Sequence, residues 1–298
     1  MASPSTLNRS LELAGTLPAL MVAADRVAAT VIQGVHGRRR VGQGDAFWQY
    51  RPYRDGDSAS RIDWRQSARS RHLFVRETEW EAAASVWLWR DASPSMQYAS
   101  LRGLDTKAVR AELITLALAS LLTDASERIA ILGSGMRPTT GRIAVRRVAE
   151  QMAEEIADKR STPPSLPPMV PLPAHGTVVL LSDWLDPLDK IEAVVRHYAS
   201  AGVRGHLVQI LDPAEEDLPF DGHVKFEGLE AEGQHTVRRV ETVRTAYGAR
   251  LAAQREGLQR LARPADWTVH LHRTDRPPQT VLLSLYLAMA DLRRLNAV

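Results

Sequence analysis

The stretch Val86-Trp-Leu-Trp-Arg-Asp91-Ala-Ser93-Pro-Ser95 is the most informative part of this chain. It begins with four apolar residues in a row, a pattern that predicts a strand covered on both faces. A carboxylate and two hydroxyls follow at alternate positions, so an extended loop directs Asp91, Ser93 and Ser95 to the same side. Three oxygen donors that converge at the carboxyl end of a strand suit Mg²⁺, whereas the alternative is an ordinary strand-to-helix turn.

A second carboxylate follows another apolar run, in Ser182-Asp183-Trp184 after residues 178–181. Because the carboxyl ends of parallel strands meet at one edge of a sheet, we expect Asp183 to lie beside Asp91. The alternative is that Asp183 caps the helix that follows it. Two strand-end carboxylates in this order favour a metal site over two unrelated turns.

Together these loops resemble the metal-ion-dependent adhesion site of von Willebrand factor A-type domains, which bind partners rather than turn over substrates. The resemblance implies that Asp91, Ser93 and Ser95 contact Mg²⁺ and that Asp183 holds a metal-bound water. It also implies a threonine from a third loop, after the helix that follows the second strand. Thr162 is the best candidate for this ligand, although the usual helix before it is missing.

From residue 85 onward, apolar strand-like runs alternate with helix-length segments, which implies crossover connections and a largely parallel sheet. The predicted strands are 85–90, 128–133, 177–182, 203–211 and 266–272. The predicted helices are 105–125, 141–158, 187–201, 241–262 and 277–294. The expected fold class is therefore α/β, with a mostly parallel, Rossmann-like and von Willebrand factor A-like sheet that has helices on both faces.

The chain is expected to have two parts. Residues 1–84 are an N-terminal helix (7–33) followed by an irregular arm rich in arginine and aromatic residues, with short strand-like pieces such as residues 73–76. Residues 85–298 form the α/β domain. Within this domain, six prolines in residues 161–173 predict an extended connector, and residues 223–240 predict a short hairpin.

Composition and motifs exclude several classes of function. The chain has 298 residues and no cysteine, which rules out disulfides, thiolate metal sites and cysteine nucleophiles. The Gly-x-Ser-x-Gly, His-Glu-x-x-His and Walker A motifs do not occur. An aspartyl-phosphate phosphatase needs a second aspartate two residues after its nucleophilic aspartate, and here that position is Ser93. His270 and His272 share one strand face, which is more typical of a partly exposed edge than of a metal site.

We expect a cytoplasmic protein, because no apolar run reaches the roughly 20 residues that cross a bilayer. The net charge is only +3, although the pI is about 9.4. The positive charge is concentrated between His36 and Arg76, where ten arginines stand against four aspartates with aromatics among them. Such a block suits nucleic-acid binding, but Arg–Asp pairs and packed aromatics such as Trp64 are the more expected explanation.

Several blocks in one order resemble the domain of unknown function family numbered 58. They are Gly42-Gln-Gly44 with Phe47, Arg51-Pro-Tyr53, Gly56-Asp57, Arg61-Ile-Asp-Trp64, Ala68-Arg69 and Asp91-Ala-Ser93-Pro-Ser95-Met96. The family commonly shows a second acid after Gly-Asp, and here that position is Ser58. The resemblance implies a von Willebrand factor A-like fold and a bacterial partner of MoxR-type AAA+ ATPases, with no enzymatic activity established.

The expected function is therefore a non-enzymatic adaptor that binds a MoxR-type AAA+ ATPase through a Mg²⁺-dependent adhesion-type site made of Asp91, Ser93, Ser95, Thr162 and Asp183. No small-molecule substrate is expected. The first alternative is a nucleic-acid-binding protein that uses residues 36–76. The second is a metal-dependent hydrolase, which the sequence supports least because it offers no evident general base.

Overall fold

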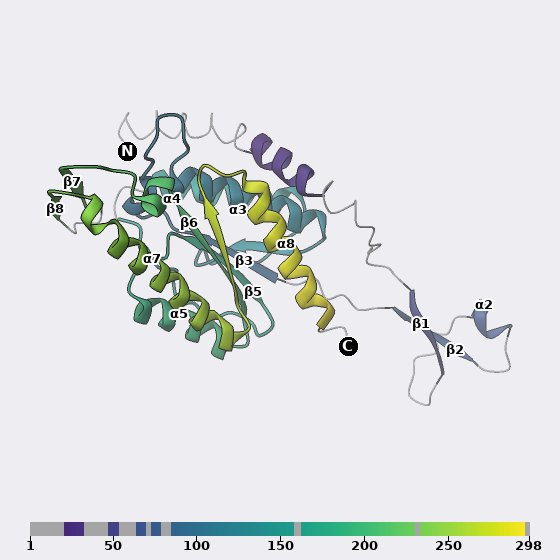
Figure 1. Cartoon of the computed structure of the whole chain (residues 1–298). Coiled ribbons are helices and arrows are strands. Elements are labelled where there is room, and N and C mark those ends of the chain that lie inside the picture. The colour runs from purple at the N-terminus through teal and green to yellow at the C-terminus, as the bar shows by residue number, and fades with distance from the viewer. Residues whose placement is uncertain are drawn as a thin grey trace. The chain divides into compact units, whose positions relative to one another are not determined.

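The computed structural model describes residues 21–32, 47–53, 64–69, 73–78, 85–157, 162–229 and 233–295 (Figure 1). The chain divides into two compact units, one made of residues 1–35 and 84–298 and the other of residues 36–83. Each unit is described by itself. The helix at residues 21–32 contributes Ala24, Val27 and Val31 to the core of the larger unit.

The larger unit contains a five-stranded parallel sheet in the order β4–β3–β5–β6–β9. Its strands are β3 (Ser85–Arg90), β4 (Arg128–Ile131), β5 (Thr177–Ser182), β6 (Arg204–Leu211) and β9 (Thr268–Arg273). All five strands were predicted from their apolar runs, with small differences at their ends. The α/β class and the parallel sheet flanked by helices are confirmed, and the arrangement is compatible with a Rossmann-like fold.

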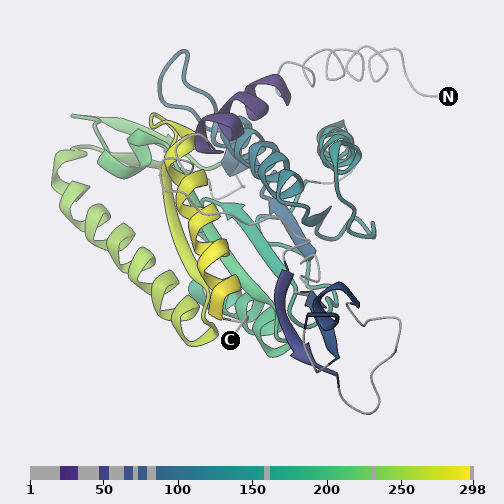
Figure 2. The ribbon, with the colours of Figure 1, turned by 90° about the vertical axis from the view of Figure 1, so that its right-hand side faces the viewer.

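Helices cover both faces of this sheet (Figure 2). One face packs against α3 (Lys107–Asp124), α4 (Arg142–Ala157) and α8 (Pro278–Leu295), and the helix at residues 21–32 joins the same hydrophobic cluster. The opposite face packs against α5 (Leu188–Ser200) and α7 (Glu241–Ala262). Each of these five labelled helices was predicted, because the segments between the strands are long enough for a crossover helix and carry apolar residues at helical spacing.

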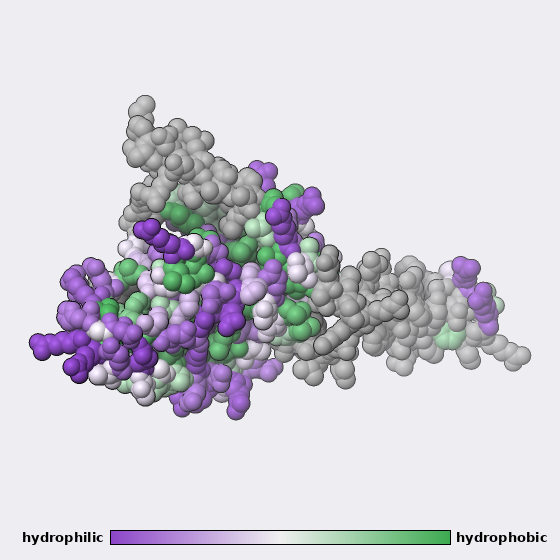
Figure 3. All heavy atoms as spheres, turned by 45° about the horizontal axis from the view of Figure 1, so that its top comes forward, coloured by the Kyte–Doolittle hydropathy of each residue, from purple (hydrophilic) through white to green (hydrophobic). Residues whose placement is uncertain are grey.

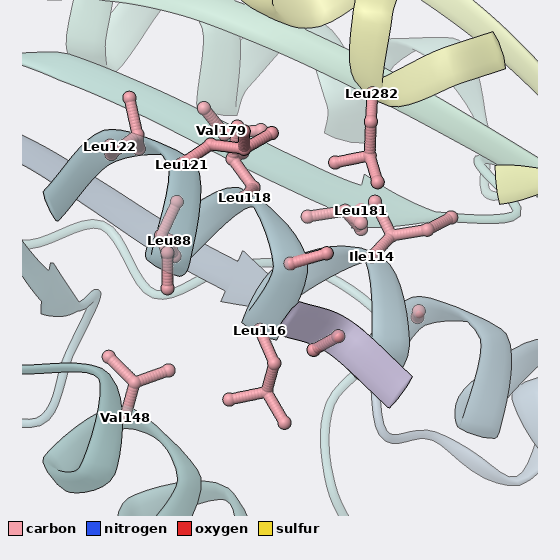
Figure 4. Close-up of a cluster of buried hydrophobic side chains, with 14 of the residues drawn as sticks. Leu88, Ile114, Leu116, Leu118, Leu121, Leu122, Val148, Val179, Leu181 and Leu282 are labelled. Carbon is pink, nitrogen blue, oxygen red and sulfur yellow. The ribbon is translucent and has the colours of Figure 1, made fainter. Parts of the chain in front are cut away.

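The alternation of side chains along β3 supplies both cores. Leu88 points into the cluster with Ile114 and Leu118 of α3, which Figure 4 shows together with Leu181 and Leu282. Its neighbours Trp87 and Trp89 belong to the other cluster, which holds the buried side chains of α5 and α7. Because both faces are covered, the strand reads as an uninterrupted apolar run in the sequence.

Short elements complete the unit. They are η2 (Pro94–Gln97), α6 (Pro213–Asp217), η3 (Arg263–Ala265) and the antiparallel hairpin of β7 (Val224–Glu227) with β8 (Gln234–Val237). The predicted hairpin is thus present. Residues 162–173 contain no helix or strand, as their prolines predict, and the Tyr198 hydroxyl donates to the Pro168 carbonyl there. Gly205 in β6 lies against Trp267, since a Cβ at this position would be 2.1 Å from the indole ring.

The histidines on β9 differ from the expectation of a partly exposed edge. His270 and His272 are both buried, although β9 is the last strand of the sheet. His270 Nδ1 lies 2.9 Å from the Ser284 hydroxyl of α8, so this helix covers their side of the strand. The other side of the strand carries Leu271, which is exposed.

The smaller unit contains β1 (Phe47–Pro52), α2 (Trp64–Ser67) and β2 (Phe74–Thr78). The two strands pair antiparallel, which confirms a strand near residues 73–76. Trp64 is 64% exposed within this unit, and the packing of the arm's aromatics on the α/β domain stays a prediction. Asp55, Asp57 and Asp63, the aspartates expected to pair with arginines, lie outside the described residues, as does most of the predicted helix 7–33 before residue 21.

Among the described residues, no helix combines the length and the apolar character that a membrane crossing requires. Figure 3 shows one face of the molecule, on which hydrophilic side chains surround small hydrophobic patches. Isolated patches of this size are ordinary on a folded protein.

Candidate functional site

The candidate site lies where the order of the strands reverses. The chain leaves β3 for β4 on one side and then crosses to β5 on the other side, so the ends of β3 and β5 flank the switch point. Open α/β sheets bind ligands outside the carboxyl ends of strands at this position. The backbone N–H of Asp91 donates to the Leu181 carbonyl at 2.8 Å, which holds the two strand ends together as the sequence predicted.

Asp91 is enclosed by hydrogen bonds. Its Oδ1 accepts from the backbone N–H of Ser93 at 2.7 Å, and its Oδ2 accepts from the Ser182 hydroxyl at 2.8 Å. The side chain is completely buried. Burial raises the pKa of Asp91 to about 6, against the hydrogen bonds from Ser93 and Ser182, which lower it. Asp91 therefore orders its loop and the end of β5.

A chain of hydroxyl groups leads from this loop to Asp183. The Ser95 hydroxyl donates to Asp183 Oδ2 at 3.0 Å, and the oxygens of Ser93 and Ser95 lie 3.1 Å apart. A hydroxyl has one proton, and Ser95 gives its proton to the carboxylate, so Ser93 must be the donor to Ser95. The structure thus brings together Asp91, Ser93, Ser95 and Asp183, four of the five predicted site residues.

The structure adds a cation that sequence reasoning missed. Lys107, the first residue of α3, places its Nζ 2.9 Å from Asp183 Oδ2 and 2.5 Å from Glu215 Oε1. The lysine side chain has no exposed surface. Burial alone would lower the pKa of Lys107, but the charges of Asp183 and Glu215 outweigh burial and raise the pKa overall. The side chain is therefore an ammonium at neutral pH.

The position of this lysine was a signal in the sequence. A helix begins with a partial positive charge, so a cation in the first turn is unfavourable unless it has anionic partners. Thr106 caps α3 by accepting from the Val109 N–H, which places Lys107 in that first turn. The chain has only four lysines, and this one begins a helix whose middle, residues 113–122, is almost entirely apolar. A buried anionic partner could have been inferred, but not which one.

Asp212 and Glu215 bring the end of β6 into the same site. They form a capping box at the start of α6: Asp212 Oδ1 accepts from the Ala214 N–H at 2.8 Å, and Glu215 Oε2 accepts from the Asp212 N–H at 2.9 Å. Asp212 Oδ2 accepts from the Ser100 N–H at 3.0 Å, which fixes the loop after β3. The pattern Asp-Pro-x-Glu at 212–215 is a helix-start signature.

Every oxygen of the four carboxylates at this edge has a donor from the protein. The last of these oxygens to be described is Asp183 Oδ1, which accepts from the Leu185 N–H at 3.2 Å. Buried polar atoms without partners are costly, and here none of the carboxylates of Asp91, Asp183, Asp212 and Glu215 is left without one. The network is complete as it stands.

The site fits a bound ammonium better than a resident Mg²⁺. Oxygens of Ser93, Ser95 and Asp183 follow one another at 3.1 and 3.0 Å, close to the roughly 3.0 Å edge of an octahedral Mg²⁺ shell. However, the Asp183 oxygen in this set already holds the Lys107 ammonium, and a second cation at that oxygen would be repelled. Among the described residues, no three His, Asp or Glu side chains are grouped to hold a metal. Mg²⁺ binding stays a prediction.

Thr162 is not part of this cluster. It is exposed, in the stretch that leads into the proline-rich connector, and its predicted role as the third-loop ligand also stays a prediction. Its neighbourhood does meet the loop after β5, since the Ser165 hydroxyl lies 3.2 Å from Asp186 Oδ1. The third strand end that contributes to the site is instead that of β6, through Glu215.

Comparisons with known proteins extend over most of the chain. The family described as "Protein of unknown function DUF58" matches residues 49–257. Uncharacterised proteins of Mycobacterium tuberculosis and Mycobacterium bovis are each 24% identical over 293 residues, which covers 92% of this chain and 89% of the relative. No solved structure matches the chain significantly. The matched span includes the arm from residue 49 onward, the loops after β3 and β5, and α6.

Proposed function

We propose, from the premise that this chain belongs to the DUF58 family of proteins of unknown function, that it is a non-enzymatic adaptor. Its partner would dock at the carboxyl edge of the five-stranded sheet, over the loops that follow β3 and β5. The observation that carries the proposal is the internal pairing of the charged groups at this edge, combined with the partial exposure of Ser95.

The pairing argues against catalysis at this position. A general base or nucleophile needs a free lone pair that substrate can reach. Lys107 is a buried ammonium, and both oxygens of Asp91 accept hydrogen bonds from within the fold. A hydrolase that uses these groups would have to break the network first. A binding surface needs only that the network hold the loops in one shape.

The rim of the site offers surface for a partner. Leu101, in the loop after β3, is 61% exposed, and Leu185, in the loop after β5, is 43% exposed. Ser95 is partly exposed, and the backbone of both loops is fixed by Asp91, Asp183 and Asp212. A preformed loop surface loses little conformational entropy on binding, which favours association.

The expected partner is a MoxR-type AAA+ ATPase, and the expected fold is von Willebrand factor A-like, both by resemblance. What supports the fold is the position of Asp91-Ala-Ser93-Pro-Ser95 after the first strand of the sheet, with Asp183 beside it. The internal ammonium means that this proposal does not depend on Mg²⁺ at the site.

Site-specific photo-crosslinking tests the docking surface. A photoreactive amino acid at Leu101 or at Leu185 should form a crosslink with the ATPase from the native host. The matched control is Ala201, which is also exposed but lies between α5 and the start of β6, at the amino edge of the sheet. Equal crosslinking from Ala201, or crosslinking from Ala201 alone, would place the partner elsewhere and contradict the proposal.

A nucleic-acid-binding function of the arm is the second candidate. The observation that favours it is the exposure of Trp64 together with Arg65 and Arg69, since an exposed aromatic ring can stack on a base while nearby arginines contact phosphates. Binding of single-stranded DNA or RNA that weakens steeply with salt would support this function. Binding that Trp64→Ala leaves unchanged would argue against it.

A further inference from the structure

We propose that Lys107 is the resident cation of the site at the carboxyl edge of the sheet. Its ammonium would supply the positive charge that a divalent ion supplies in an adhesion-type site. The site would then hold its loops in place without any metal. This inference does not rest on the adaptor function, because it concerns how the site is built and not what docks on it.

The first argument is position. The Lys107 ammonium contacts the Asp183 oxygen that also accepts from Ser95, the one residue of the loop after β3 that bonds directly to that carboxylate. It contacts Glu215 as well, at the start of α6. The cation therefore connects the segments that follow β5 and β6 directly, and Ser95 attaches the loop after β3 to the same Asp183 oxygen.

The second argument is charge. A fully buried ammonium is costly unless it is paired and hydrogen-bonded, and here it has two carboxylate partners at 2.9 and 2.5 Å. The two carboxylates in turn would repel each other without a cation between them. The lysine and the pair Asp183–Glu215 are therefore mutually dependent, which a surface lysine with one partner would not be.

The third argument is that the oxygens are already used. All four carboxylates of the network accept from protein donors, so a divalent ion would have to displace a donor before it could bind. Lys107 is the donor that both Asp183 and Glu215 share, and its loss would leave Asp183 Oδ2 with the Ser95 hydroxyl alone and would remove the charged donor from Glu215 Oε1. Removing its charge should therefore convert a metal-independent site into one that binds a divalent ion.

Calorimetric titration with Mn²⁺ on the full chain tests this inference. The wild-type protein should show no stoichiometric binding. Lys107→Met, which keeps the bulk of the side chain, should bind one Mn²⁺ per chain, with an affinity at least about tenfold above any weak binding to the wild type. The melting temperature of Lys107→Met should also rise on addition of Mg²⁺ at constant ionic strength, while that of the wild type should not. A merely structural lysine would give a less stable protein without a gain of metal binding.

Two further variants keep the test decisive if Lys107→Met does not fold. The double variant Lys107→Met, Glu215→Gln removes one charge of each sign and should fold, with weaker Mn²⁺ binding than the single variant. Asp183→Asn in the wild-type background should leave the response to Mn²⁺ unchanged, because no ion is bound there. One Mn²⁺ bound per wild-type chain, and lost in Asp183→Asn, would overturn the inference.

Discussion

Lys107 Nζ lies 2.9 Å from Asp183 Oδ2 and joins the first turn of α3 to the end of β5, 76 residues away in sequence. Both side chains are buried, so solvent screens the pair little. The contact explains how two loops that are distant in sequence keep one geometry at the switch point of the sheet. It also makes stability and site structure depend on the same lysine.

Lys107→Met should lower the free energy of unfolding by about 3–5 kcal/mol in the absence of divalent ions, because it leaves the buried carboxylate of Asp183 and the partly buried carboxylate of Glu215 without their cation. Urea denaturation with a chelator present measures the change. Lys190→Met, at an exposed position of α5, is the control and should change stability by less than about 0.5 kcal/mol. Equal effects of the two variants would mean that the Lys107 contacts contribute little.

Loss of both hydroxyls in the loop after β3 should separate docking from folding. The variant Ser93→Ala, Ser95→Ala keeps Asp183 paired with Lys107 and should fold, with a stability loss of about 1–3 kcal/mol for two hydrogen bonds. In a pull-down at constant Mg²⁺ and nucleotide concentrations, this variant should no longer capture the ATPase. Ser200→Ala, at the end of α5, should retain it, and retention by both variants would move the interface away from this edge.

The buried imidazole of His206 should make the folded chain less stable in acid. Burial, and the charges of His270 and Arg204, lower the pKa of His206 to about 3 in the folded chain, from 6.5 when it is unfolded. Between these values the unfolded chain binds a proton at His206 that the folded chain does not, so the contribution of His206 to stability falls as pH drops below 6.5. The cost at pH 5 relative to pH 7 is about 2 kcal/mol.

The check is the free energy of unfolding of His206→Gln as a function of pH. This variant should lose the part of the decrease between pH 7 and pH 5 that His206 contributes. His223→Gln, at an exposed position, serves as the control and should follow the wild type. A His206→Gln variant whose stability falls between pH 7 and pH 5 as steeply as that of the wild type would show that His206 does not stay neutral in the folded chain.

Trp64→Ala should leave the melting temperature nearly unchanged, because the indole is largely exposed and its removal creates no cavity. Differential scanning calorimetry measures this directly. A drop equivalent to about 3–5 kcal/mol, as for a packed tryptophan, would mean that the ring is buried in the protein in solution. The same variant also tests the nucleic-acid alternative, through its binding of single-stranded DNA or RNA at increasing salt concentrations.

Much of the α/β unit could be predicted from the sequence, because its strands are apolar runs of strand length and their connections are long enough for helices. The meeting of Asp91 with Asp183 was also predictable, since both follow strands whose carboxyl ends share an edge. These inferences need only local pattern and the topology of parallel sheets.

The rest depends on contacts between distant residues. Glu215 is 108 residues from Lys107, and nothing local indicates that the two would pair. The resemblance predicts a third-loop ligand at Thr162, whereas the acid that joins the site is Glu215, part of a capping box on α6. The sequence likewise could not predict the exposure of Trp64, because aromatics beside arginines occur both in packed and in exposed segments.

The most direct test of the account is the NMR signal of the Lys107 ammonium. The chain has four lysines, so ¹⁵N labelling of lysine gives few side-chain signals, and Lys107→Met assigns one of them. We predict that the Lys107 Nζ gives a slowly exchanging ammonium signal at neutral pH, and that added Mn²⁺ leaves this signal unbroadened. Selective loss of the Lys107 signal at one equivalent of Mn²⁺ would place a divalent ion beside Asp183 and contradict the account.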